Sequence, residues 1–232
     1  MLSIIIPLYN HTEHLSSVLS SIVRQTYRPL EIIIVDDGST PPVDTKKYSA
    51  GDISITWIRQ ENKGAPAARN AGLDKAAGEY IIFWDADVIA EPEMLEKMVN
   101  KLEQEKDMSF VYCNSRFGWK KFRIHSFDET KLKEMNYIHS TTLIRKKDAI
   151  RWDESLKRFQ DWDLWLTMVE QGKSGAWIDE YLYQVMPHKG GISSWLPSFA
   201  YKKPWRYLPF FYKKVKAYEK AKEVIKKKHN LK

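Results

Sequence analysis

Two aspartates, Asp85 and Asp87, directly follow the apolar run 80–84 (Tyr-Ile-Ile-Phe-Trp). A buried strand that ends in this way brings negative charge to the carboxyl edge of a sheet, where open α/β folds bind ligands. Because unpaired buried carboxylates are costly, such a pair is normally neutralised by a cation or by hydrogen bonds. Carboxylate oxygens suit Mg²⁺ or Mn²⁺, with phosphate oxygens completing the shell. Taken alone, these residues also fit a surface turn.

Two more polar loops follow apolar runs earlier in the chain, at 7–10 (Pro-Leu-Tyr-Asn) and 36–40 (Asp-Asp-Gly-Ser-Thr). An aromatic ring beside a carboxylate could hold a nucleobase, with Tyr9 stacking on the base and Asp37 accepting a hydrogen bond from a ring N–H. Each loop alone also fits an ordinary turn or a half-buried aromatic. Three such loops after successive strands favour one shared binding edge.

A fourth candidate segment runs from Asn62 to Gly72 (Asn-Lys-Gly-Ala-Pro-Ala-Ala-Arg-Asn-Ala-Gly). Lys63 and Arg69 flank the start of a predicted helix, where backbone N–H groups and the helix dipole favour anions. A diphosphate would suit this position. Arg69 also fits a solvent-facing residue in a surface ion pair, which would contribute little.

Loops that meet at one sheet edge need a fold in which strands alternate with helices, and the sequence predicts such a fold. Apolar runs with strand character alternate with helical patterns: strands at 3–8, 30–35, 53–58 and 80–84, and helices at 11–25, 64–77 and 92–105. Farther along, strands are predicted at 108–114, 137–144 and 176–185, and a short helix at 161–171. This order predicts an α/β fold with a doubly wound, mostly parallel mixed sheet and helices on both faces.

Composition and charge narrow the function class. With 43% hydrophobic and 29% charged residues, the 232-residue chain is ordinary for a globular protein, and no run approaches the ~20 apolar residues of a membrane span. The first residues lack the features of a signal peptide. The lone Cys113 lies in an apolar run, which predicts a small core residue and fits a reducing compartment. We therefore expect a cytoplasmic location.

The net charge of +7 is concentrated at the C-terminus. Residues 196–232 hold 12 Lys and Arg against 2 Glu (+10), so residues 1–195 hold 25 against 28 acidic residues (−3). We therefore predict a domain at 1–195 and a basic, aromatic, partly helical tail at 196–232. The tail fits two interpretations, an anchor to an anionic membrane surface at the inner face or an amphipathic helix packed on the domain.

Taken together and in order, these motifs resemble the family 2 nucleotide-sugar glycosyltransferases, which have the GT-A fold. The matching segments are 3–10, 35–40, 62–72, 85–87, 152–156, 160–166 and 183–188. The resemblance covers residues 1 to about 195. It implies transfer of a sugar from a nucleoside-diphosphate sugar, most often a UDP-sugar, to a carbohydrate or glycolipid acceptor in polysaccharide or glycolipid synthesis.

The resemblance also implies roles for the donor-binding residues. Tyr9 and Asp37 would hold the base, next to Pro7 and Lys63, and Arg69 would lie near the base or the diphosphate. Asp85 would face the ribose. Asp87 would ligate a Mn²⁺ or Mg²⁺ ion that bridges the phosphates, and His188 would complete that metal site.

On the acceptor side, the resemblance implies that Asp161 is the general base, with Gln160 and Trp162 beside the acceptor. Asp163 lies two residues farther along the same predicted helix, so both carboxylates cannot face one pocket. We expect Asp161 to be the base and Asp163 to be structural or part of the helix cap. Gln160 stands where the family usually has Glu, which leaves the orientation of the acceptor open.

The chemistry is direct displacement. A cation and basic groups stabilise the departing diphosphate, a carboxylate takes the acceptor proton, and attack from the opposite face inverts the anomeric centre. A nucleotidyltransferase is an alternative, but residues 7–11 are not a Gly-rich phosphate loop. A nucleic-acid-binding protein is a second alternative, which the mildly acidic body does not favour, so nucleic acid is not an expected partner.

Overall fold

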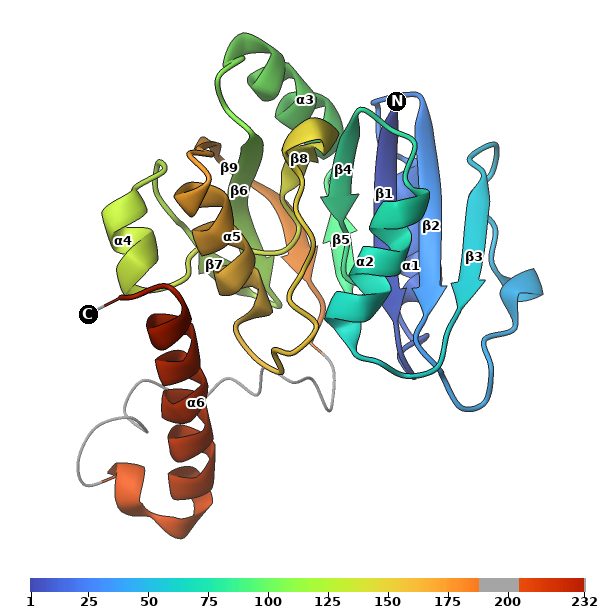
Figure 1. The fold of residues 1–232 in the computed structure, drawn as a ribbon. Helices are drawn as coiled ribbons and strands as arrows, with labels where there is room; N and C mark the ends of the chain where they lie inside the picture. The colour runs from blue at the N-terminus through green and yellow to red at the C-terminus, as the bar shows by residue number, and fades with distance from the viewer. Residues whose placement is uncertain (188–204, 232) are drawn as a thin grey trace.

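The structure is a computed structural model that describes residues 1–187 and 205–231. In this part of the chain, nine strands form one sheet in the order β3-β2-β1-β4-β8-β6-β9-β5, with β7 beside β6 (Figure 1). The strands are β1 (Leu2–Leu8), β2 (Leu30–Asp36), β3 (Ile55–Arg59), β4 (Tyr80–Phe83), β5 (Val88–Ala90), β6 (Phe110–Phe117), β7 (Lys120–Phe122), β8 (Leu143–Arg145) and β9 (Gly175–Val185).

The predicted mostly parallel mixed sheet is confirmed. Strand β1 pairs in parallel with β2 and β4, and β2 with β3. Strand β8 lies antiparallel between β4 and β6, so β6 and its parallel partner β9 run in the same direction as β1. Strands β5 and β7 are antiparallel to their neighbours. Six of the described strands therefore share one direction and three oppose it.

Alternation along the strands divides the core into two clusters, one on each face of the sheet. Ile4 and Ile6 pack on the face that α1 (Leu15–Val23) and α3 (Met94–Gln104) cover. Ile5 packs on the other face, with α2 (Ala65–Lys75), α4 (Glu129–Glu134) and α5 (Gln160–Glu170). Cys113 is buried in the first cluster, and burial raises the pKa of its thiol to about 12.

The segment predicted as a strand at 137–144 is mostly loop, and only Leu143–Arg145 forms β8. Side chains compete here with strand hydrogen bonds: the backbone N–H of Thr141 donates to His139 Nδ1 at 3.1 Å, and Thr142 Oγ1 donates to the His139 carbonyl at 2.7 Å. Helix α4 was also not predicted, although Asp128 caps it by accepting from the Lys131 N–H at 3.0 Å.

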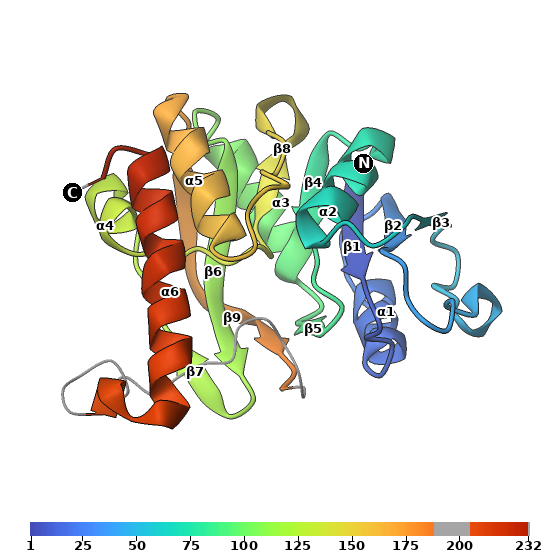
Figure 2. The same ribbon diagram turned by 60° about the horizontal axis from the view of Figure 1, so that its bottom comes forward.

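The C-terminal helix α6 (Pro209–Lys228) follows the short 3₁₀ turn Trp205–Tyr207. It lies beside α5 (Figure 2), and its first residues project past the sheet in the view of Figure 1. Val215 and Ile225 are buried, and Tyr218 packs edge-on against Phe159 with ring centroids 5.0 Å apart. The helix is therefore packed on the domain along part of its length, while the boundary predicted at residue 195 lies outside the described residues. No described helix is long and apolar enough to cross a bilayer.

Candidate active site

The three predicted loops meet at one edge of the sheet. Strands β1, β2 and β4 are mutually parallel neighbours, so residues 9–10, 37–40 and 84–87 leave the sheet at the same carboxyl edge (Figure 1). Crossed hydrogen bonds join the first two loops: Asn10 N–H donates to Ser39 Oγ at 2.9 Å, and Thr40 N–H donates to Asn10 Oδ1 at 2.7 Å. Asn10 has a φ of 51°. Tyr9 lies beside this junction and is 51% exposed, so its ring is accessible for stacking.

Asp37 is 2% exposed, and its carboxylate holds the loop that leads into α2. Oδ1 accepts from Lys63 N–H at 2.9 Å and from Gln60 Nε2 at 2.7 Å, and Oδ2 accepts from Gly64 N–H at 2.8 Å. These bonds fill three of the roughly four acceptor positions of a carboxylate. Asp37 therefore shapes the loop, and its contact with a base stays a prediction.

The start of α2 lies behind this loop. Gly64 has a φ of 93° in the N-cap position, a conformation that glycine adopts without strain. The side chain of Lys63 is exposed, and Pro7 in β1 is half-buried. Both lie where the sequence predicted them, near the loops of the carboxyl edge.

Arg69 does not face solvent; it is 8% exposed and forms a central ion pair. Its Nη2 lies 2.8 Å from Asp85 Oδ1, and its guanidinium stacks on the Trp152 ring at 4.4 Å. Nη1 reaches Gln160 Oε1 at 3.5 Å. Its Nε has no hydrogen-bond partner among the described residues. Arg69 thus links α2 to the loop after β4 and to the start of α5.

The other oxygen of Asp85 faces the loop before β8. Ser140 Oγ donates to Asp85 Oδ2 at 2.7 Å, and His139 Nε2 lies 3.9 Å from the same oxygen. Burial raises the pKa of Asp85, but the charge of Arg69, followed by His139 and the Ser140 hydrogen bond, outweighs it and leaves that pKa below its usual value. Asp85 is therefore an ionised carboxylate at neutral pH.

The pKa of Asp161 is shifted in the opposite direction to that of Asp85. Burial raises its pKa above the usual value, and His139, the Trp162 N–H and Arg69 offset this only in part. Its Oδ2 accepts from Asn136 Nδ2 at 2.8 Å, and its Oδ1 accepts from Trp162 N–H at 2.9 Å. A half-buried carboxylate whose pKa is raised is a suitable proton acceptor near neutral pH. Two carboxylates with opposite shifts also mark a functional site.

Sequence reasoning missed His139, Ser140, Asn136 and Trp152. The first three lie in the stretch 136–142, whose apolar residues suggested a strand. The physical signal was the cluster Asn136, His139, Ser140, Thr141 and Thr142, which is too polar for a buried strand. These residues complete the wall that faces the two carboxylates.

Trp162 corrects one expectation. We expected it beside the acceptor, but its side chain is 1% exposed, and its Nε1 donates to the Leu132 carbonyl at 2.6 Å. It therefore packs α5 on α4. Gln160 stays near the site through Arg69, and its Nε2 donates to the Leu156 carbonyl at 2.9 Å. The N-cap position of α5 belongs to Phe159, with a φ of 57° and no side-chain cap.

A cation would be held by Asp87 together with phosphate oxygens of a donor. Asp87 is half-buried at the same edge as Asp85, whose two oxygens accept from Arg69 and Ser140. The Asp87 carbonyl accepts from Met186 N–H at 2.8 Å, which brings the end of β9 alongside. Among residues 1–187 and 205–231, no three His, Cys, Asp or Glu side chains form a metal cluster. His188 lies outside these residues. The donor set fits Mg²⁺ or Mn²⁺ with phosphates supplying most ligands.

Solved structures share this architecture. TarS of Staphylococcus aureus in complex with UDP-GlcNAc superposes with a TM-score of 0.72 at 19% identity, covering 84% of this chain and 61% of that one. The mannosyltransferase PcManGT of Pyrobaculum calidifontis, solved with GDP-Man and Mn²⁺, gives a TM-score of 0.64 at 18% identity, covering 84% and 59%. The fold is thus that of the GT-A glycosyltransferases.

Sequence comparisons identify the family. The sequence model of "Glycosyl transferase family 2" matches residues 3–161. An uncharacterized glycosyltransferase of Methanocaldococcus jannaschii is 32% identical over 200 residues, 78% of this chain and 69% of that protein. Glycosyltransferase GlyA of Streptococcus pneumoniae is 39% identical over 111 residues, 47% of this chain and 16% of that protein. The chain belongs to glycosyl transferase family 2, and it spans less than two thirds of the length of several relatives.

Proposed function

We propose that this glycosyltransferase moves a hexose from a nucleoside-diphosphate sugar, a UDP-sugar in the first instance, to an acceptor hydroxyl with inversion. One observation carries the proposal: the ionised pair Arg69–Asp85 and the half-buried Asp161 of raised pKa come together at the ligand-binding edge of the sheet. A donor and a proton acceptor are thereby brought to the same place.

In this mechanism, Tyr9 stacks on the base, and Asp85 binds the ribose with its orientation fixed by Arg69 and Ser140. Asp87 would hold a Mn²⁺ or Mg²⁺ ion, which would supply positive charge next to the departing diphosphate. Asp161 takes the proton of the acceptor hydroxyl, while Asn136 fixes the direction of its carboxylate. The acceptor oxygen bonds to the anomeric carbon from the face opposite the diphosphate while the bond to the diphosphate oxygen breaks, so the nucleoside diphosphate leaves and the anomeric centre is inverted.

Thermal shift with UDP, GDP and dTDP, each with and without Mn²⁺, tests the donor assignment. We expect one nucleotide to raise the melting temperature more with Mn²⁺ than without it. Asp87→Ala should remove the Mn²⁺-dependent part, and Asp107→Ala, a change at an exposed aspartate outside the site, should retain it. Unchanged Mn²⁺ dependence in Asp87→Ala would overturn the metal assignment.

The acceptor is proposed to be a carbohydrate or glycolipid of cell-surface polysaccharide synthesis. The β6–β7 hairpin at the carboxyl end of β6 supports this class, because Trp119 is 93% exposed and Phe117 is 45% exposed. Exposed aromatic faces beside Lys120 and Lys121 suit a sugar ring that carries an anionic group. Trp119→Ala should raise the acceptor KM and leave nucleotide binding unchanged.

We further propose that the start of α6 attaches the enzyme to an anionic membrane surface on the cytoplasmic side. Exposed aromatic and apolar side chains lie in the 3₁₀ turn before α6 at Trp205 (47%) and Tyr207 (57%), at the N-cap residue Leu208 (44%), and in the first turn of α6 at Tyr212 (45%). The exposed lysines Lys213, Lys214, Lys216 and Lys220 follow. Each basic residue near such a surface contributes about 1 kcal/mol. Flotation with anionic vesicles should recover the protein and flotation with zwitterionic vesicles should not; equal, negligible recovery would refute the attachment.

A further inference from the structure

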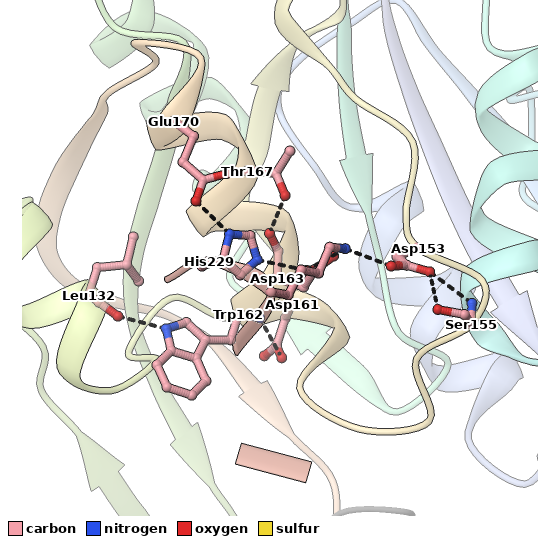
Figure 3. A network of polar contacts seen from close by, with 10 residues as sticks. Leu132, Asp153, Ser155, Asp161, Trp162, Asp163, Thr167, Glu170 and His229 are labelled. Atoms are coloured by element: carbon pink, nitrogen blue, oxygen red, sulfur yellow. Dashed lines mark hydrogen bonds and ion pairs between the residues drawn. The ribbon is translucent and has the colours of Figure 1, made fainter. Parts of the chain in front are cut away.

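The turn at the C-terminal end of α6 contacts α5, the helix that carries Asp161. The proposed chemistry does not use this contact. His229 is buried with a 2% exposed side chain between two carboxylates of α5. Its Nε2 lies 2.8 Å from Asp163 Oδ1, and its Nδ1 lies 2.7 Å from Glu170 Oε1 (Figure 3). Both ring nitrogens thus lie within hydrogen-bond distance of a carboxylate oxygen.

The neighbouring Lys228 extends this contact to the loop before α5. Its Nζ lies 2.7 Å from Asp163 Oδ1 and 2.6 Å from Asp153 Oδ2. Asp153 in turn accepts from Ser155 N–H at 2.9 Å and from Ser155 Oγ at 2.6 Å (Figure 3). One C-terminal turn therefore fixes both the helix α5 and the loop that leads into it.

That loop also supports the donor side of the site. Next to Asp153, Trp152 stacks under Arg69 at 4.4 Å, and its backbone exchanges two hydrogen bonds with Asn70, of 2.8 Å and 3.0 Å. The C-terminal turn consequently holds one element that carries the base and another that supports the Arg69–Asp85 pair.

The start of α5 depends on such support. Phe159 occupies the N-cap position in a left-handed conformation with no side-chain cap, so local sequence does not fix this end of the helix. Asp163 lies two residues beyond Asp161 and points to a different side of the helix. The side chain of Asp163 is buried, with 4% of its surface exposed. Its ion pairs therefore fix the helix on the side away from the site, while the Asp161 side chain faces the site.

We propose that Lys228 and His229 are positioning residues that hold Asp161 in its catalytic orientation through Asp163. This inference rests on the proposed function of Asp161. Displacing a catalytic group by about 1 Å can cost on the order of 100-fold in rate, so a loosened first turn would reduce kcat strongly. Replacing His229 leaves the Lys228–Asp153 contact that supports the Arg69–Asp85 side in place, so nucleotide affinity should change little in His229 variants.

The test compares His229→Ala and His229→Gln with Lys227→Ala, a matched change at the exposed neighbouring lysine. We measure release of nucleoside diphosphate from the best donor, the Kd of that nucleotide with Mn²⁺, and hydrogen exchange of the backbone amides. His229→Ala should lower kcat at least 10-fold with Kd changed less than twofold. His229→Gln keeps a donor toward Asp163 and should retain an intermediate kcat. Lys227→Ala should match the wild type.

Hydrogen exchange separates this proposal from the proposed function. In His229→Ala, exchange should rise at residues 160–164 relative to α2, whether or not a donor has been found. Equal exchange at 160–164 in the variant and the wild type would overturn the positioning role. An unchanged kcat in His229→Ala would also overturn it. Failure of the wild type to bind any nucleotide would instead refute the proposed function. Hydrogen exchange at 160–164 would then still show whether the contact of His229 with Asp163 orders the start of α5.

Discussion

The Arg69–Asp85 pair allows a quantitative prediction that does not depend on any substrate. At 2.8 Å and an effective dielectric constant of about 20, the Coulomb attraction is about 6 kcal/mol before desolvation is subtracted. The side chains of Arg69 and Asp85 are 10% and 25% exposed, so water screens the pair only weakly. Arg69→Met leaves Asp85 with Ser140 and His139, and we expect a loss of about 3 kcal/mol in unfolding free energy.

The double-mutant cycle isolates the pair. Asp85→Asn should cost about 2 kcal/mol, because Arg69 keeps its stacking on Trp152. The double variant should lose about 3 kcal/mol of unfolding free energy, because neither charge is then left without its partner. Compared with the two single losses, this gives a coupling energy of about 2 kcal/mol between the residues. Urea unfolding followed by circular dichroism, without ligand, measures all four proteins. Additive losses, with a coupling below about 0.5 kcal/mol, would refute the view that this pair organises the site.

The remaining predictions concern Gly72, Lys228 and Asp161. Gly72→Ala places a Cβ 2.3 Å from Ile5 Cγ2 and should cost about 2 kcal/mol in urea unfolding, and the double variant with Ile5→Ala, which lacks Cγ2, should lose less than the sum of the two single losses. Lys228 holds the pKa of Asp153 at about 2, below its unfolded value of about 3.9, so this stability is present above pH ~4 and lost toward pH 2. Lys228→Ala should weaken the pH dependence of the unfolding free energy between pH ~4 and pH 2. An unchanged pH dependence would contradict the pairing of Lys228 with Asp153. Burial raises the pKa of Asp161, and the base works only when ionised, so kcat/KM should fall on the acid side above the usual aspartate range. Asp161→Asn should abolish transfer with nucleotide binding retained, and surviving activity would place the base elsewhere.

The first half of the fold was predictable because its elements carry strong local signals. Alternating isoleucines in β1 and β2 face both sides of a covered sheet, and Gly64 and Pro66 mark the start of α2. The loops at 9–10, 37–40 and 84–87 then follow from the parallel order of the strands. The presence of Tyr9, Arg69 and Asp85 at one edge could therefore be predicted.

The second half was predicted less well, because long-range contacts decide it. The polar stretch around His139 has no regular structure of its own and is fixed by contacts with Asp85 and with its own backbone. Trp162 has the residue type of a sugar-stacking side chain, and only the packing of α4 against α5 shows that it is buried. The contact of His229 with Asp163 joins residues 66 positions apart, a pairing that sequence spacing does not indicate.

The crossed hydrogen bonds between Asn10 and the loop at 39–40 have a thermodynamic consequence. They tie the backbone next to Tyr9 to the loop at 39–40, and Asp37 in the same loop holds the segment that leads into α2, so the wall proposed to bind the base is ordered when the chain folds. The conformational entropy of that wall is then lost once, during folding, and is not subtracted again from the affinity for a nucleotide. Removing the link, as in Asn10→Ala, would transfer this entropic cost from folding to binding.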